Sequence, residues 1–209
     1  MLRFVAILIP ATLYMACFGY GTVLFALTGA SLFTKLYGFT TAETGLILSI
    51  PLLIGGGIGE LSAGWVTDWL SNRHAQRHNG ERLPESRLTA IWGALLIPIG
   101  LIIEGVCLSH ADTVSWVGSA FGMGIANMGL QIATTTIYAY TTDYAIGMLW
   151  IHTNEFQFSL PFAERIGIQF AWLTFAMVVV VLLVPVILLR SSGSKWRKLR
   201  SQSPLNTET

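Results

Sequence analysis

Five long stretches of this sequence carry few charged residues, and this pattern constrains the fold more than any other feature. They cover residues 4–32, 42–70, 88–109, 117–141 and 166–189. Each is long enough to cross a hydrocarbon layer about 30 Å thick as a helix. Only 11% of all residues are charged, whereas about a quarter are charged in an average soluble domain. We therefore expect an all-α polytopic membrane protein with five clear transmembrane helices.

Arginines and lysines gather in one loop and in the tail. Residues 72–87 contain four arginines against two glutamates, and residues 191–209 contain two lysines and two arginines. Such an excess marks the cytoplasmic side of a membrane. We expect both basic segments to be cytoplasmic, and residues 1–190 to form a single transmembrane domain.

The two basic segments require an even number of membrane crossings between them, whereas only three of the clear stretches lie there. A sixth crossing is therefore expected over residues 145–162, a weak candidate that is short and polar at its centre. It could be a strained half-span, a re-entrant piece or an interfacial helix. The fold class is thus five clear transmembrane helices plus one degenerate or re-entrant segment.

The second stretch ends in a glycine-rich helix that carries two acidic residues. Four residues spaced by four share one predicted face of this helix: Gly56, Glu60, Gly64 and Asp68. A second row of small residues lies beside them: Gly55, Gly59 and Ala63. Small residues let helices approach closely in membranes, so we expect this helix to be wedged between others. Carboxylates there are costly unless they meet protein or water.

Polar side chains inside two other stretches are candidates to line a substrate cavity. The candidates are Tyr14 and Tyr20 in the first stretch, and Asn127, Gln131 and Thr135 in the fourth. Polar groups at this depth need partners or water, so the alternative is hydrogen bonding between helices. Glu104, in the third stretch, is close enough to the outer end to reach the membrane interface.

The sequence lacks the residue patterns that are typical of several classes of function. No zinc-ligand spacing or basic-aromatic pattern is present, so we expect no metal site, no cofactor and no nucleic-acid partner. Glu60 and Asp68 are two helical turns apart, too far to share a proton directly, and no activated nucleophile is evident. We expect no enzyme. Cys17 and Cys107 both fall inside predicted spans, which makes a disulfide framework improbable.

Three segments resemble the major facilitator superfamily. They are the helix end Gly64-x-x-x-Asp68 with Arg73, the loop of residues 77–87, and Leu160-Pro-Phe-Ala-Glu-Arg-Ile-Gly167. They look most like the C-terminal half of fungal members in the drug, polyamine and small-cation proton-coupled group. The resemblance implies helices seven, eight, nine, ten and twelve of a twelve-helix transporter, with a defective eleventh helix over residues 145–162. Trp69 departs from the pattern, because a basic residue usually follows the aspartate.

The resemblance implies secondary-active, proton-coupled transport of a small organic solute or drug-like metabolite, such as efflux. Glu60, Gly64, Asp68 and Arg73 would act in coupling or gating, while the five polar candidates named above would line the cavity. The chain is expected to be a truncated half that needs a second half-transporter chain or a homodimer. The alternative is a transport-incompetent membrane protein or an assembly or regulatory partner. We expect a multi-pass protein of the plasma membrane, with the vacuolar membrane as the second choice.

Overall fold

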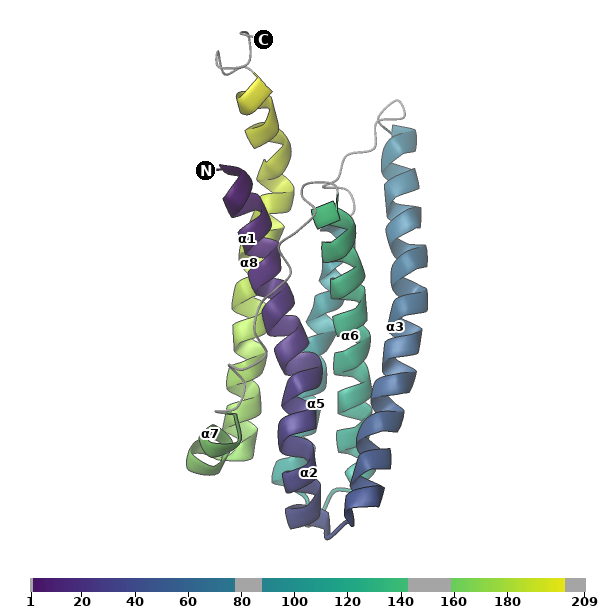
Figure 1. Ribbon diagram of the computed structural model, residues 1–209, viewed down its shortest axis with the longest axis vertical. Helices are drawn as coiled ribbons and strands as arrows, with labels where there is room; N and C mark the ends of the chain where they lie inside the picture. The colour runs from purple at the N-terminus through teal and green to yellow at the C-terminus, as the bar shows by residue number, and fades with distance from the viewer. Residues whose placement is uncertain (1, 78–87, 143–158, 202–209) are drawn as a thin grey trace.

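The computed structural model describes residues 2–77, 88–142 and 159–201, and these ranges form a bundle of long helices along one axis (Figure 1). The first crossing is a continuous helical rod made of α1 (Leu2–Phe18), η1 (Gly19–Val23) and α2 (Leu24–Tyr37). Here η1 is a π-helical turn with one extra residue in its hydrogen-bonded ring. Such bulges inside α-helices frequently mark functional sites.

The turn after α2 follows from local chemistry. Gly38 adopts a left-handed conformation with a φ of 69°, and its N–H donates to the Thr34 carbonyl over 3.1 Å. Glycine takes this conformation without a steric cost, which is why it commonly ends helices. Thr40 and Glu43 then form a reciprocal capping box: the Thr40 N–H donates to a Glu43 carboxylate oxygen over 2.9 Å.

The remaining elements complete the bundle. They are α3 (Thr41–Arg77), η2 (Leu88–Leu95), α5 (Leu96–Ser109), α6 (Trp116–Thr142), α7 (Ser159–Ile166) and α8 (Ile168–Ser201). No strand occurs in these described residues, so the prediction of an all-α fold is confirmed. η2 is a 3₁₀ turn that leads directly into α5, so the two together form one crossing.

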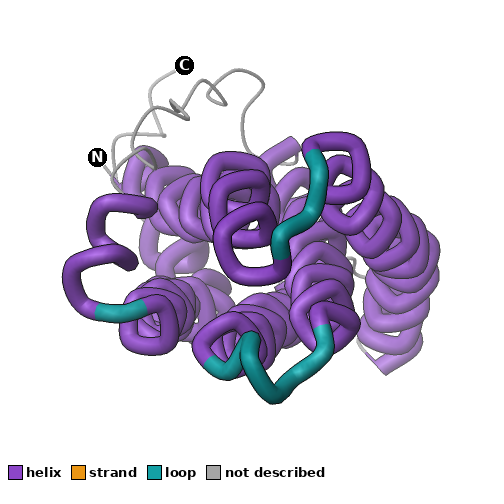
Figure 2. The backbone as a smooth tube through the Cα atoms, turned by 90° about the horizontal axis from the view of Figure 1, so that it is seen from below, coloured by secondary structure: helices purple, strands orange, loops and turns teal. Residues whose placement is uncertain are grey.

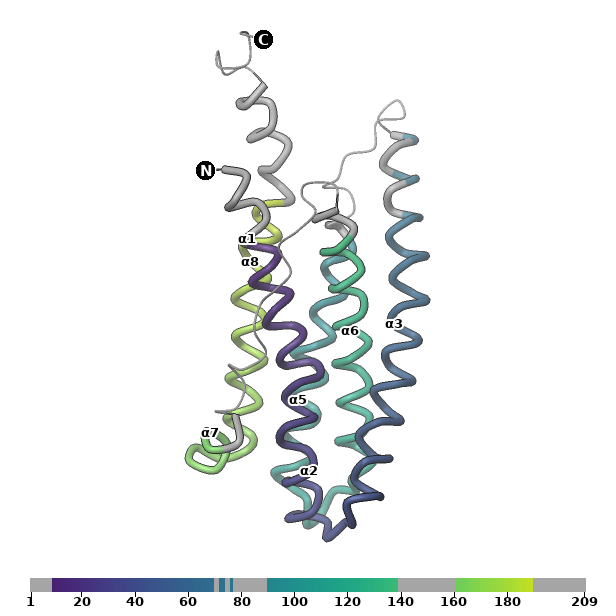
Figure 3. Tube along the Cα trace, viewed as in Figure 1, coloured from purple at the N-terminus to yellow at the C-terminus, as the bar shows by residue number. Residues whose placement is uncertain are grey.

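The direction of each helix bears on the number of crossings. α1 begins, and α3, α6 and α8 end, at one end of the bundle, whereas α7 lies at the other end (Figures 1 and 3). The end of α6 and α7 therefore lie at opposite ends of the bundle. The sixth crossing predicted over 145–162 lies mostly outside the described residues, and its last four residues form the start of α7.

Four helices in the described ranges are long and apolar enough to cross a membrane: Ile9–Tyr37, Thr41–Trp69, Ala90–Ser109 and Ile168–Leu189. α6 has 27 residues and is therefore also long enough, but glycines, threonines and two amides make it less apolar. This composition suits a helix that contacts α1, α3, α5 and η2, in a bundle that Figure 2 shows end-on. α8 packs on the other side, against α5 and α1.

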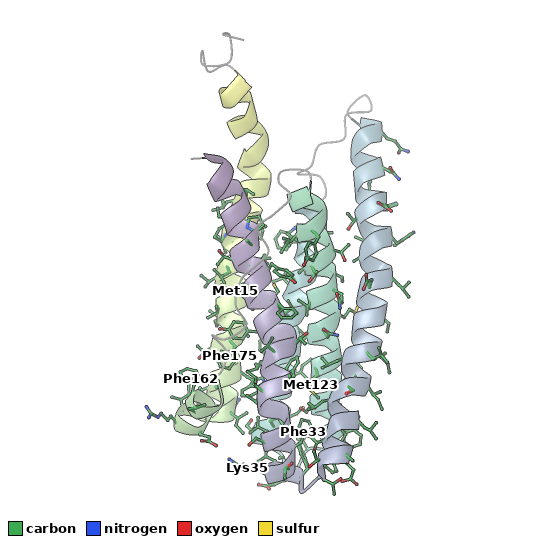
Figure 4. The ribbon with its side chains drawn as sticks, viewed as in Figure 1. Met15, Phe33, Lys35, Met123, Phe162 and Phe175 are labelled. Carbon is green, nitrogen blue, oxygen red and sulfur yellow. The ribbon has the colours of Figure 1, made fainter. Side chains whose placement is uncertain are left out.

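Glycines bring α5 and α6 unusually close. A methyl group added at Gly100 would lie 2.5 Å from the Gly122 carbonyl oxygen and 2.8 Å from the Ala126 Cβ. The small-residue face of α6 therefore packs on α5, as such faces do in membrane helix pairs. Around this contact the core is filled by large buried side chains, among them Phe25, Phe33, Met123, Trp172 and Phe175 (Figure 4).

α3 differs from the sequence expectation, because one face packs on α6 and the opposite face is exposed. Only 22% of its most apolar window is buried, against 61% for the first crossing. The contact face is the row of Gly55, Gly59 and Ala63, all of which are buried. The other predicted row does not stay on one side: a spacing of four turns the position by about 40° each time, or about 120° from Gly56 to Asp68. Gly56 therefore faces α6, whereas Glu60 and Asp68 are exposed.

Candidate functional site

Asn127 ties three helices together in the interior of the bundle. Its side chain is 6% exposed, and its amide nitrogen donates to the Leu52 carbonyl of α3. The Thr22 hydroxyl, in the π-helical turn η1, donates to the Asn127 amide oxygen over 3.3 Å. Both ends of the amide are thus satisfied by neighbouring helices, as a buried polar group requires. Asn127 has a structural role at this junction, and its role in lining a cavity stays a prediction.

Gly56 makes this junction possible. A methyl group at Gly56 would lie 2.9 Å from the Asn127 amide nitrogen, so a larger residue would push the amide away from the Leu52 carbonyl. One turn further along α6, Gln131 covers the same glycine-rich face: its Cβ would be 2.9 Å from a methyl group at Gly59. Gln131 and Thr135 are both half-buried. The α3 glycines therefore leave room for the polar side chains of α6.

Tyr14 continues the polar line between the first crossing and α6. The Tyr138 hydroxyl donates to the Tyr14 hydroxyl over 3.3 Å, and the two rings meet edge to face with centroids 5.5 Å apart. Asn127, Gln131, Thr135 and Tyr138 advance by four, four and three along α6, so they share one face. We call Tyr14, Thr22 and these four α6 residues the polar seam.

Tyr138 was not among the predicted site residues. It could have been found by continuing the spacing of Asn127, Gln131 and Thr135 by one more turn. Tyr20, by contrast, was predicted beside Tyr14 but lies elsewhere. It is 8% exposed, and its ring stacks on Phe175 of α8 with centroids 5.0 Å apart. The structure therefore brings together four of the five predicted cavity residues along the seam, and places Tyr20 in the contact with α8.

The predicted coupling and gating residues lie along the outer face of α3. Glu60 and Asp68 are exposed, and Glu60 forms no ion pair within the described ranges. A methyl group at Gly64 would meet nothing within 4 Å, so this glycine leaves open space beside it. The Arg73 guanidinium lies over the Trp69 ring, 5.1 Å from its centroid. Trp69, the departure from the family pattern, thus offers Arg73 a cation–π contact.

Glu104 is a buried acid, which corrects the expectation that it reaches the membrane interface. Its side chain is 2% exposed, and the Trp172 indole N–H of α8 donates to its carboxyl Oε2 over 2.9 Å. Spacing along α5 could not show this, because the side that faces α8 is set by the packing of the bundle.

Two shallow grooves lie on the side of α3 and α6 away from the seam. The larger, about 410 Å³, is lined by apolar residues such as Ile54, Ile58, Phe121 and Met128. The smaller, about 400 Å³, lies at the start of α3 beside Phe39 and Trp116. Neither groove contains a predicted cavity residue. Within the described part of the chain, no group of three or more His, Cys, Asp or Glu side chains could hold a metal ion.

The chain is similar to several fungal transporters over part of its length. It is 34% identical over 127 residues to the MFS transporter cpaT of Aspergillus oryzae, which covers 60% of this chain and 25% of that protein. It is 31% identical over 126 residues to a probable efflux pump of Aspergillus flavus, covering 59% of this chain and 29% of the pump. An uncharacterised MFS-type transporter of Schizosaccharomyces pombe is 26% identical over 176 residues, covering 77% of this chain and 30% of that protein.

These relatives confirm the resemblance predicted from the sequence motifs. No protein-family model matches the chain, and no solved structure matches it. The chain spans between a quarter and a third of the length of these relatives. Its apolar helices and these relatives together make it an integral, multi-pass membrane protein that is related to fungal transporters of the major facilitator superfamily.

Proposed function

We propose that this chain forms one half of a secondary-active transporter that exports a small organic solute. The half-transporter interpretation corresponds to the C-terminal six-helix repeat of the superfamily, and a second half would come from another chain or from a second copy. Transporters of this kind rock two helical halves around a site near the middle of the membrane. One relative is named as a probable efflux pump, which supports the outward direction.

The observation that carries the proposal is the polar seam. Hydroxyl and amide groups recur from Asn127 to Tyr138 along α6, in a bundle whose core cluster consists of apolar and aromatic side chains. The seam offers hydrogen bonds and aromatic faces but no charged side chain. It therefore suits an uncharged organic solute with polar substituents, bound by hydrogen bonds and ring contacts.

The outer face of α3 supports a proton-coupled mechanism and a partner. A carboxyl group that faces lipid is costly, so acids inside spans usually face protein or water and mark ion pathways. We assign Glu60 the coupling role, and Gly64, Asp68 and Arg73 a gating role at the cytoplasmic end of the same helix. Leu53 and Leu61, 78% and 80% exposed, extend this face for contact with the second half.

Transport in reconstituted vesicles tests the proposal. The purified chain is placed in liposomes, alone and with candidate second halves, and a panel of uncharged organic solutes is followed under an imposed pH gradient. Gln131→Ala should lower transport, while Gln169→Ala, at an exposed position on α8, should leave it unchanged. Glu60→Gln should remove the dependence on the pH gradient. If Gln131→Ala and Gln169→Ala change transport equally, the seam is not the binding site.

The exposed face of α3 also fits an assembly or regulatory partner that does not transport. Crosslinking separates the two functions. A cysteine at Gly64, in a variant with Cys17 and Cys107 replaced by alanine, should give a defined homodimer or a defined complex if the chain completes a transporter. Monomers that carry no transport activity with any second half would favour the non-transporting partner. We place the protein in the plasma membrane, which fluorescence microscopy of the tagged chain can check.

A further inference from the structure

A buried carboxyl group links α5 to α8 outside the polar seam. Glu104 accepts the Trp172 indole hydrogen over 2.9 Å, and the two side chains are 2% and 0% exposed. Glycines fit both groups tightly: a methyl group at Gly105 would lie 2.6 Å from the Trp172 Cβ, and one at Gly122 would lie 3.2 Å from the Glu104 Cβ. The pair therefore has a closely fitted place in the bundle.

Among the residues that the structure describes, no counter-ion faces this carboxyl group. α6 contains no Asp, Glu, Lys, Arg or His between residues 116 and 142, and α8 contains none between residues 168 and 189. η2 likewise contains none. On α5 itself the only other titratable side chain is Cys107, almost one turn further along.

The titratable groups of the first crossing are directed elsewhere. The Tyr20 ring, on η1, stacks on Phe175, and the Tyr37 ring lies 5.6 Å from Phe33. Lys35 forms an exposed ion pair with Glu164 over 2.8 Å (Figure 4). In the loop beyond α5, the His110 ring is 3.0 Å from the Val106 carbonyl at the end of that helix. None of these groups supplies a positive charge to Glu104.

The protonation state follows from these surroundings. An ionised carboxylate removed from water without a counter-ion pays a large desolvation cost, and a single hydrogen bond does not offset it. A neutral carboxylic acid avoids this cost, while its carbonyl oxygen still accepts the indole hydrogen.

We propose that Glu104 is an intramembrane proton-binding site that holds α5 against α8 through Trp172. The carboxyl lies five residues before the end of α5, about 7.5 Å along the helix, so it exchanges its proton with water at the end of the bundle that carries α7. Loss of the proton to that water leaves a carboxylate, whose need for hydration separates α5 from α8 at this end. The evidence for this site does not rest on the proposed transport function or on Glu60.

The packing beyond Trp172 leads toward the polar seam. The Trp172 and Phe175 rings are 6.0 Å apart, and Phe175 stacks on Tyr20 of the π-helical turn. Two residues along this turn, Thr22 binds Asn127. A change in the α5–α8 contact therefore acts on the same turn that anchors the seam.

Infrared spectroscopy of the chain in liposomes tests the proposal. At neutral pH the spectrum should contain the carbonyl stretch of a buried carboxylic acid. This band should be missing from Glu104→Gln, should move to higher frequency in Trp172→Phe, and should be unchanged in Glu60→Gln. Trp172→Phe keeps an aromatic ring and removes the hydrogen-bond donor together with one ring of the indole, so it is the nearest aromatic variant without a donor.

Two results would overturn the proposal. One is a spectrum at neutral pH in which Glu104→Gln removes no acid band, since the group would then be ionised. The other is a band that Trp172→Phe does not move, which decides the question even if Glu104→Gln fails to fold.

Discussion

The contact between α3 and α6 depends on a glycine backbone that leaves no room for a methyl group. The change Gly55→Ala would place a Cβ 2.8 Å from the Gly124 carbonyl carbon and 2.9 Å from its Cα. These atoms belong to the backbone of α6, so the clash can be relieved only when the two helices move apart. Overpacking of this kind costs about 1–3 kcal/mol. The movement would also lengthen the hydrogen bond from Asn127 to the Leu52 carbonyl.

A change at a second glycine of the same helix is the control that separates the packing cost from other effects of the substitution. Gly57 is two residues away, and a methyl group there would meet nothing within 4 Å. Both changes bring the same gain of up to about 1 kcal/mol from replacing glycine by alanine in a helix. The difference between Gly55→Ala and Gly57→Ala is therefore the packing term alone. At about 1.4 kcal/mol for each factor of ten, it corresponds to an unfolding constant roughly 5- to 150-fold larger for Gly55→Ala.

The assay is reversible unfolding of the purified chain in mixed micelles, followed by circular dichroism as the fraction of denaturing detergent is raised. Wild type, Gly55→Ala and Gly57→Ala are compared under identical conditions. We expect Gly55→Ala to unfold at a lower detergent fraction than wild type, and Gly57→Ala to unfold at the same or a higher fraction. Equal midpoints for the two variants would refute the close backbone contact.

Three further outcomes follow from other contacts. Asn127→Ala removes hydrogen bonds to two helices, each worth about 0.6 kcal/mol on average in membranes. The free energy of unfolding should therefore fall by about 1 kcal/mol, and an unchanged value would contradict the role of Asn127 in joining the helices. A double-mutant cycle of Lys35→Ala and Glu164→Ala should give a coupling energy below about 1 kcal/mol, because the two side chains are 60% and 55% exposed. A larger coupling energy would contradict this and show that the ion pair fixes α7 firmly to α2. Gly64→Ala should leave the free energy of unfolding unchanged, because a methyl group there would meet nothing within 4 Å, and a loss of stability would place Gly64 in the packed interior.

Much of the fold follows from local features of the sequence. Apolar length predicted the crossings, whereas the capping box of Thr40 and Glu43 at the start of α3 was seen only in the structure. The basic loop and tail predicted a further crossing after α6, over residues 145–162, and this stays a prediction because most of these residues lie outside the described ranges.

The orientation of side chains was harder to predict, because it depends on which helices become neighbours. The row from Gly56 to Asp68 follows a spacing of four, but this spacing drifts around the helix, so its two ends face different surroundings. Tyr20 and Tyr14 lie on the same crossing, yet only Tyr14 reaches α6. Glu104 is buried because residues from distant parts of the chain, Trp172 of α8 and Gly122 of α6, pack against it.

The topology in the membrane tests the central claim most directly, namely that these helices cross a bilayer with the loop of residues 72–87 on the same face as both termini. Small epitope tags at the two termini, and a single cysteine in that loop, can be probed in intact and permeabilised cells. We predict that all three sites react only after permeabilisation, which places them in the cytoplasm. Termini on opposite faces would contradict the even number of crossings, and with it the half-transporter interpretation.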